Sequence, residues 1–257
     1  MTILLYLFLF LLGTVIGSFL NAAIWRAREE KPLSRGRSMC PHCCTTLKPY
    51  ELLPVLSFIF LRGKCRTCKK PISWQYPLVE IITGLLFVLA AGIHTISLEQ
   101  FSFLYLRDIF ILSCLVFVFV YDFLYQEILD RVTTIPAIVL LPISWYFGWH
   151  SGASLLLGVL IGAGFFLAQF YLSRGKWVGG GDVRLGFFMG AILGFPGILL
   201  ALLLAYIGGA LWSVGLILLK KKSVSSETPF GTYLAIATVI TMFWGEKIIT
   251  WYLGFLR

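Results

Sequence analysis

Long uncharged runs of apolar residues recur along the whole 257-residue chain and limit its fold more than any other feature. The first of them, ILLYLFLFLLGTVIGSFLNAAIW, extends from residue 3 to residue 25. A helix of about 20 apolar residues is long enough to cross the hydrocarbon core of a bilayer, which is about 30 Å thick. Repeated runs of this length predict an all-α polytopic membrane protein that lies in a lipid bilayer.

The composition agrees with this fold class. The chain is 59% hydrophobic and 13% charged, and its mean hydropathy is +0.89, whereas a soluble domain is about half apolar and about one quarter charged. The first apolar run lacks the basic amino-terminal region and the small-residue cleavage site of a secretory signal peptide. We therefore expect it to be retained as a membrane span.

The apolar runs predict about eight transmembrane helices, a number that returns the chain to its starting side. The longest run, from Leu185 to Leu219, is interrupted at 195–197 by Phe-Pro-Gly, which predicts a tight turn between two spans. The expected spans are 2–24, 77–95, 102–121, 132–149, 152–173, 183–195, 197–219 and 230–255.

The distribution of basic residues gives this topology a direction. If Met1 lies outside, the inside segments 25–76, 122–131, 174–184 and 220–229 hold 11, 1, 3 and 3 of the 21 Lys and Arg residues, which leaves Arg107, Lys247 and Arg257 elsewhere. An excess of basic residues marks the cytosolic side of membrane proteins. The net charge of +9 is therefore interpreted as a consequence of this topology in the cytoplasmic membrane. We do not expect a nucleic-acid partner.

Two CxxC pairs lie in the longest polar segment, 25–76, which the charge pattern places in the cytosol. The segment has too little apolar content to form its own core, so a bound metal would be needed to hold it together. Two such pairs fit a tetrahedral site for structural Zn²⁺, while two disulfides, a redox pair or a lapsed site are the alternatives. The candidate metal ligands are Cys40, Cys43, Cys65 and Cys68.

Two aspartates stand at the predicted inside boundary of the membrane. Asp122 ends the third span, and Asp182 follows three successive glycines, Gly179, Gly180 and Gly181. Two carboxyl groups that meet can share a proton, after which one activates a water molecule and the other donates to a scissile carbonyl. This pattern indicates aspartic-protease chemistry, and the glycines would leave room for an extended peptide.

Other interpretations of the two aspartates stay open from spacing alone. Asp182 can cap the helix that begins near Val183, since aspartate is common at helix starts. A proton- or cation-coupled transporter also uses carboxylates in the membrane, although the middle parts of these spans hold few ionisable residues. A non-catalytic membrane assembly protein with a zinc segment is the third possibility.

Several segments together resemble the bacterial type IV prepilin leader peptidases, which are membrane aspartyl proteases with a GxGD motif. The resemblance covers nearly the whole chain and includes one residue outside the motif segments, Glu80, which matches an acid of the family. The similar segments are GSFLNAAIWR at 17–26, RSMCPHC at 37–43, LKPYELLPVLSFIFLRGKCRTCKKPIS at 47–73, YPLVE at 76–80, GGGD at 179–182 and TPFGTYLA at 228–235.

The resemblance implies that Asp122 and Asp182 are the catalytic pair and that the chain cleaves leaders of prepilins and pseudopilins at the cytosolic membrane face. It also implies methylation of the new amino terminus with S-adenosylmethionine, because members with the four cysteines generally have both activities. The methyl-donor residues are not predicted. Glu80 is interpreted first as half of a structural ion pair with cations of segment 25–76, and the alternative is that it serves the methyl transfer.

The predicted organisation is a first transmembrane helix at 1–24, a cytosolic tetracysteine domain at 25–76 and a transmembrane protease core at 77–257. Three departures from the family pattern concern the site. Arg184 stands where lysine is frequent, Asp130 follows Leu129 instead of a proline, and Cys44 stands where glycine is frequent. Asp130 is interpreted as a supporting residue and Asp122 as the catalytic one.

Overall fold

The computed structural model describes residues 2–33, 36–94, 103–219 and 229–255, and within these ranges the chain is helical and has no β-strand. The all-α prediction is therefore confirmed. The elements are α1 (Thr2–Arg28), η1 (Pro49–Leu52), α2 (Leu56–Phe60), α3 (Gln75–Ile93), α4 (Phe103–Tyr125), α5 (Asp130–Tyr146), α6 (Gly152–Ser173), α7 (Gly180–Leu218) and α8 (Phe230–Phe255).

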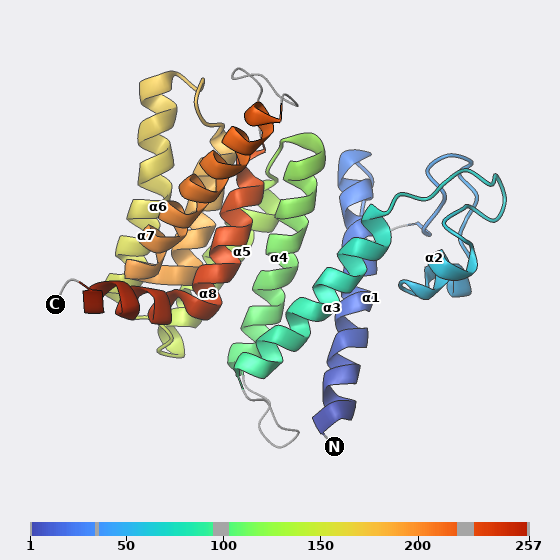
Figure 1. Cartoon of the computed structure of the whole chain (residues 1–257), viewed down its shortest axis with the longest axis horizontal. Coiled ribbons are helices and arrows are strands. Elements are labelled where there is room, and N and C mark those ends of the chain that lie inside the picture. Colours follow the sequence, from blue (N-terminus) through green and yellow to red (C-terminus); the bar gives the residue numbers. More distant parts are fainter. Residues whose placement is uncertain (1, 34–35, 95–102, 220–228, 256–257) are drawn as a thin grey trace. The chain divides into compact units, whose positions relative to one another are not determined.

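The chain forms two compact units, Met1–Phe117 and Val118–Arg257, and the boundary falls inside α4. The first unit contains α1, α3, most of α4 and the polar segment with η1 and α2. The second contains the end of α4 and all later helices (Figure 1). The predicted division at residues 24 and 76 stays a prediction.

Six helices of the described ranges are long and apolar enough to span a membrane, namely α1, α3, α4, α6, α7 and α8. Many of their large apolar side chains are exposed, for example Leu7 of α1 and Leu160 of α6. Exposed apolar surface of this extent suits contact with lipid. The predicted fourth span corresponds to α5, a 17-residue helix with two internal prolines.

α7 is composed of two helical arms that meet at Gly194 and Phe195, where the backbone leaves helical geometry. Before this break, Gly190 lies against Gly158 of α6, and further back Gly186 lies against Gly162. After the break, the hydroxyl group of Tyr206 donates a hydrogen bond to Gln169, near the other end of α6. The second arm therefore runs back along α6.

Because of this reversal, two predicted spans, 183–195 and 197–219, correspond to the two arms of the single helix α7. The reversal lies within a residue of the predicted Phe-Pro-Gly turn, and Gly194 has a φ of 58°, a left-handed value that glycine adopts without steric cost. When the two arms of α7 are counted separately and α5 is added, the structure agrees with the prediction of about eight membrane helices.

Glycine pairs set the close packing between α6 and the first arm of α7. A Cβ atom built on Gly162 would clash with the carbonyl oxygen of Gly186, and it would lie 3.0 Å from the Gly186 carbonyl carbon. Small residues allow membrane helices to approach at backbone distance, which provides van der Waals contact where lipid offers no hydrophobic driving force. This packing holds the start of α7, where Asp182 lies.

Gly162→Ala should therefore lower the thermal unfolding midpoint of the purified protein in detergent. The backbone of α7 cannot move out of the way as a flexible side chain would, so we expect a loss of about 1–3 kcal/mol, as for other overpacked cores. Gly164→Ala is the matched control, because a Cβ there meets nothing within 4 Å. Equal midpoints for the two variants would contradict the glycine contact.

Candidate functional site

Asp122 lies near the end of α4 and is buried, with 4% of its surface exposed. Its Oδ2 atom accepts a hydrogen bond of 2.8 Å from the backbone N–H of Thr232, in the first turn of α8. The neighbouring residue is Gly231, where a Cβ atom would lie only 2.9 Å from the Asp122 carboxyl group. The start of α8 thus holds this carboxyl group with the Thr232 N–H donor, and the absence of a side chain at Gly231 leaves space for it.

Asp182 lies in the first turn of α7 and is partly exposed. Its Oδ2 atom accepts a hydrogen bond of 2.9 Å from the backbone N–H of Gly179, the residue that caps the helix. The alternative that Asp182 caps a helix beginning near Val183 is therefore wrong in position, because α7 begins at Gly180 and Asp182 lies in its first turn, where its side chain accepts from the N-cap residue. No described residue donates a hydrogen bond to its Oδ1 atom, so capping leaves one oxygen atom for other use.

Ile128 connects the surroundings of the two carboxyl groups. Its side chain is buried and lies where a Cβ on Gly181 or on Gly231 would touch it at 3.0 Å. Gly181 directly precedes Asp182, and Gly231 contacts Asp122, so the backbone segments next to the two acids pack on the same aliphatic residue within the second unit.

The three glycines before Asp182 have different surroundings. Gly180 has open space where its Cβ would be, Gly181 lies against Ile128, and Gly179 donates to Asp182. The predicted room beside Asp182 therefore exists at Gly180. The sequence did not identify Ile128 or Thr232 as members of the site, because an isoleucine and a backbone amide carry no motif.

Asp130 does not join this pair of acids. It begins α5, is largely exposed, and forms an ion pair with Arg184 of α7. Both partners face solvent, and such exposed pairs contribute little to stability, typically up to about 1 kcal/mol. The interpretation of Asp130 as a supporting residue fits this position. Its partner Arg184 is the residue that stands where lysine is frequent in the family.

Gly231→Ala should reduce proteolytic turnover at least about tenfold, because displacement of a reacting group by about 1 Å can cost up to about 10²-fold. The added methyl group would lie 2.9 Å from the Asp122 carboxyl and 3.0 Å from Ile128. Initial cleavage rates with a peptide substrate would measure the effect. Gly254→Ala, also on α8 but in open space, should leave the rate unchanged, and an active Gly231→Ala protein would contradict this placement of Asp122.

The four predicted metal ligands come together in the first unit. The Sγ atoms of Cys40, Cys43, Cys65 and Cys68 all lie within 4.8 Å of one another. Cys40 and Cys68 are 3.9 Å apart and Cys43 and Cys65 are 4.0 Å apart, whereas a disulfide joins its sulfurs at about 2.05 Å. None of them forms a disulfide in the structure, and the four sulfur atoms could together hold a metal ion.

The two CxxC turns have the same backbone geometry. An antiparallel bridge closes each of them, Met39 with Thr46 and Lys64 with Pro71. In each turn the residue after the second cysteine has a left-handed φ, 55° at Cys44 and 59° at Lys69. Cys44 is exposed and lies outside the sulfur cluster. The frequent glycine at position 44 is explained by this φ value, which glycine adopts easily.

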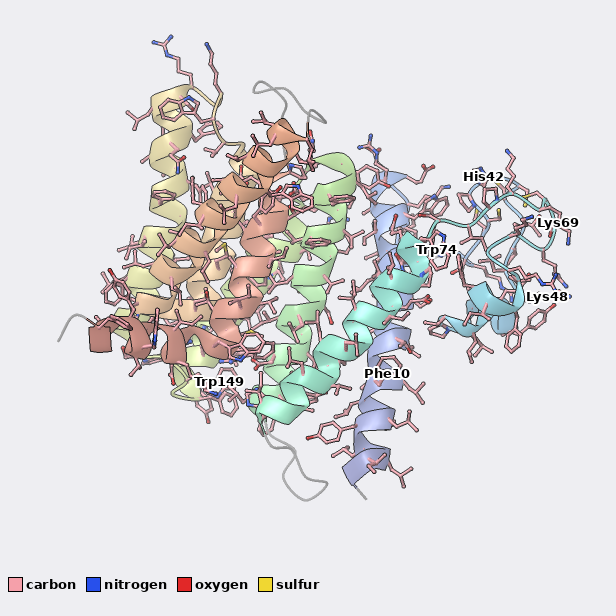
Figure 2. The ribbon with its side chains drawn as sticks, viewed as in Figure 1. Phe10, His42, Lys48, Lys69, Trp74 and Trp149 are labelled. Atoms are coloured by element: carbon pink, nitrogen blue, oxygen red, sulfur yellow. The ribbon has the colours of Figure 1, made fainter. Side chains whose placement is uncertain are left out.

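The sulfur spacing fits zinc. Four thiolates around Zn²⁺ at about 2.3 Å define a tetrahedron with edges of about 3.8 Å, close to the two measured separations. Hydrogen bonding with the side chain and backbone of Thr45 lowers the pKa of Cys43 to about 6, whereas burial raises the pKa of Cys40 to about 11. In Figure 2, Lys48 and Lys69 project from the outer edge of this segment.

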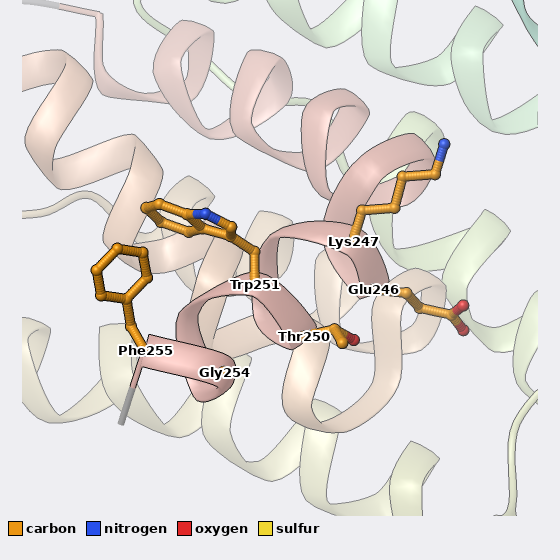
Figure 3. Close-up of a pocket in the computed structure, with 6 residues that line it drawn as sticks. All are labelled: Glu246, Lys247, Thr250, Trp251, Gly254 and Phe255. Carbon is orange, nitrogen blue, oxygen red and sulfur yellow. The ribbon is translucent and has the colours of Figure 1, made fainter. Parts of the chain in front are cut away.

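A hollow of about 690 Å³ near the carboxyl end of α8 is less suited to chemistry. Figure 3 shows Trp251 and Phe255 on one side of it and Glu246 and Lys247 on the other. The six lining residues all belong to one stretch of a single helix, so they cannot enclose a ligand on several sides. The candidate site therefore remains the pair of aspartates, and the sulfur cluster is a separate candidate metal centre.

Comparison with known proteins places the chain in a family. Residues 11–93 match the family model "Bacterial Peptidase A24 N-terminal domain", and residues 109–214 match "Type IV leader peptidase family". No solved structure matches the chain significantly.

Curated relatives include three proteins with the name prepilin leader peptidase/N-methyltransferase. The protein from Aeromonas hydrophila is 36% identical and the alignment covers 95% of this chain and 92% of the relative. The Bacillus subtilis protein is 34% identical over 95% and 96%, and the Legionella pneumophila protein is 35% identical over 97% and 95%. At this identity and coverage, the chain belongs to the type IV prepilin leader peptidase family.

Proposed function

We propose that this chain is a multi-pass inner-membrane enzyme that cleaves the leader of type IV prepilin-like proteins and methylates the new amino terminus. The observation that supports the proposal is that Gly181, next to Asp182, and Gly231, in contact with Asp122, both pack on Ile128. The names of the relatives state both activities for those proteins. The two aspartates supply the chemistry that the first activity needs.

The proposed cleavage follows from two acids that share one proton. The ionised carboxylate takes a proton from a water molecule, whose oxygen attacks the scissile carbonyl carbon, while the protonated acid donates to the carbonyl oxygen. Collapse of this intermediate breaks the C–N bond, and the amine leaves with a proton. The Thr232 N–H bond to Asp122 and the Gly179 N–H bond to Asp182 fix the two acids for these transfers.

The substrate would approach as an extended peptide beside the glycines. Gly180 has open space at its Cβ position, so the peptide backbone can come near Asp182 without meeting a side chain. We propose that the apolar amino-terminal helix of a prepilin or pseudopilin lies in the bilayer next to the bundle. Its basic leader would remain in the aqueous phase.

The site is proposed to face the cytosol. The support is the distribution of Lys and Arg, which favours the side of segment 25–76 as the inside. On that topology, the end of α4 with Asp122 and the start of α7 with Asp182 lie at the same inside boundary. Leader cleavage would therefore occur at the cytosolic face of the membrane.

We also propose that the metal is Zn²⁺ and that its role is structural. Cys40, Cys43, Cys65 and Cys68 would complete a tetrahedral shell, which leaves no open coordination position for a substrate. The metal would hold segment 25–76 in shape. S-adenosylmethionine, when bound, would supply an electrophilic methyl group to the new terminal amine.

Mass spectrometry of a prepilin incubated with the purified full chain, with and without S-adenosylmethionine, tests both activities. We expect loss of the leader in both reactions and one additional methyl group only with the donor. Cleavage without methylation would remove the second activity. An intact prepilin, when a family member known to be active cuts it in parallel, would contradict the proposal and favour a non-catalytic assembly protein.

A further inference from the structure

A cavity of about 780 Å³ lies in the first unit, between α1, α3 and the tetracysteine segment. This volume falls in the usual range of small-molecule sites, about 300–1,000 Å³. Its lining contains aromatic side chains, two carboxylates and four side chains that can carry positive charge. It includes Ser18, Trp25, Glu51, Phe58, Tyr76 and Glu80, and the basic ones are Arg26, His42, Arg66 and Lys70. The cleavage mechanism above uses none of these residues.

The two carboxylates of the cavity differ in their charge partners. Glu51 forms an ion pair with Arg66 at 3.1 Å. Glu80 is only 6% exposed, and no Lys, Arg or His of the residues that the structure describes lies within ion-pair distance of it. The predicted ion pair of Glu80 is therefore wrong for that part of the chain. A buried carboxylate without a cation is unfavourable unless something compensates its charge.

The surroundings of Glu80 hold its carboxylate rigidly at the cavity. Gly17 brings α1 so close that a Cβ there would lie 2.7 Å from the Glu80 Cα. The Oε2 atom accepts a hydrogen bond of 2.7 Å from the backbone N–H of Val55. Val55 has a φ of 60°, which is rare and strained for a β-branched residue and is often found at functional sites.

We infer that this cavity binds S-adenosylmethionine and that Glu80 provides the negative charge opposite its sulfonium group. The inference rests on the proposed methyltransferase activity, because that activity requires a bound donor. The flat adenine ring suits the aromatic part of the lining, at Trp25, Phe58 and Tyr76. The donor supplies the cation that Glu80 lacks.

A sulfonium group fits this position better than an ammonium group. A buried ammonium carries three N–H donors, each of which needs an acceptor, and one Glu80 oxygen already accepts from Val55. A sulfonium ion has no N–H group, so charge and aromatic faces are enough to bind it, as for other alkylated cations. Tyr76 lies one helical turn before Glu80, on the same face of α3.

Methyl transfer removes the positive charge that Glu80 would face. The neutral terminal amine attacks the methyl carbon, the N–C bond forms, the S–C bond breaks, and the amine then releases a proton to water. Sulfur becomes neutral in the product, S-adenosylhomocysteine. The attraction to Glu80 is thus lost after transfer, so the cavity should prefer the donor over the product.

Calorimetric titration of the purified full chain in detergent with S-adenosylmethionine and with S-adenosylhomocysteine tests the inference. For Glu80→Gln, we expect the Kd of the donor to rise at least about tenfold and that of the product less than about twofold. Ala22→Trp places a large side chain in the lining of the cavity and should abolish binding of both. Glu246→Gln removes an exposed carboxylate on α8 and should change neither.

Metal content and the thermal unfolding midpoint report whether each variant is folded. If Glu80→Gln does not fold, donor binding by Ala22→Trp still tests whether this cavity is the binding site. Unchanged donor binding by folded Ala22→Trp would overturn the choice of cavity. Equal weakening of donor and product in Glu80→Gln would overturn the role of the sulfonium charge. If the wild-type chain neither cleaves nor methylates prepilin, the proposed function itself fails, which is a different result.

Discussion

Asp122→Asn and Asp182→Asn, made separately, should each lower the rate of leader cleavage by about 10²- to 10⁴-fold, the usual contribution of a general acid or base. Asparagine preserves the size of each side chain but cannot take a proton from water. It also retains an oxygen that can accept from Thr232 or Gly179. Initial rates measured by mass spectrometry on a prepilin substrate would show the loss without a change in folding.

Asp130→Asn is the matched control for this pair. Asp130 is exposed and forms an ion pair with Arg184 outside the two-acid site, so cleavage should continue near the wild-type rate. The double variant of Asp122 and Asp182 should be about as slow as either single variant, because residues that act as a unit are not additive. Full cleavage by both single variants would exclude the two aspartates as the catalytic pair.

Loss of the metal should have the largest effect on stability. Structural zinc in small cysteine sites contributes about 10–16 kcal/mol of apparent binding free energy at neutral pH, and segment 25–76 has little apolar core of its own. Cys40→Ser should therefore reduce the metal content from about one ion per chain to a small fraction. The segment should then become sensitive to limited proteolysis.

Elemental analysis and proteolytic mapping would measure these two outcomes. Cys44→Ser is the matched control, because Cys44 adjoins a ligand but lies outside the sulfur cluster, and it should retain both the metal and protease resistance. A Cys40→Ser protein with full metal content would contradict the four-sulfur site. A mass two hydrogens lower than expected for each cysteine pair in the wild type would instead identify disulfides.

Much of the fold was predictable because the bilayer imposes a simple length rule. The run at residues 3–25 became α1, and the Phe-Pro-Gly turn was placed within a residue of the break at Gly194. Local rules of this kind need no knowledge of tertiary contacts. The gathering of the four cysteines was equally predictable from the two CxxC pairs, since metal ligands have characteristic spacing and each pair forms one turn.

Tertiary contacts explain what the sequence did not reveal. Asp108 is 2% exposed and lies 2.6 Å from His94 and 2.7 Å from Arg107, partners that no motif in the sequence indicated. Glu80 was expected to have a cation, yet it accepts from a backbone amide 25 residues away. Such partners are set by helix packing, which a linear pattern does not encode.

The matched turns around the four sulfurs have a consequence for the stretch between them. An ion that joins Cys43 to Cys65 closes a loop, residues 44–64, and removes entropy that the open chain would retain. This loop carries Glu51, Pro54 and Phe58, which line the cavity, and so it forms one wall of that cavity. Ion and nucleoside ligand would then stabilise each other across that wall, and thermodynamic reciprocity requires the two effects to be equal.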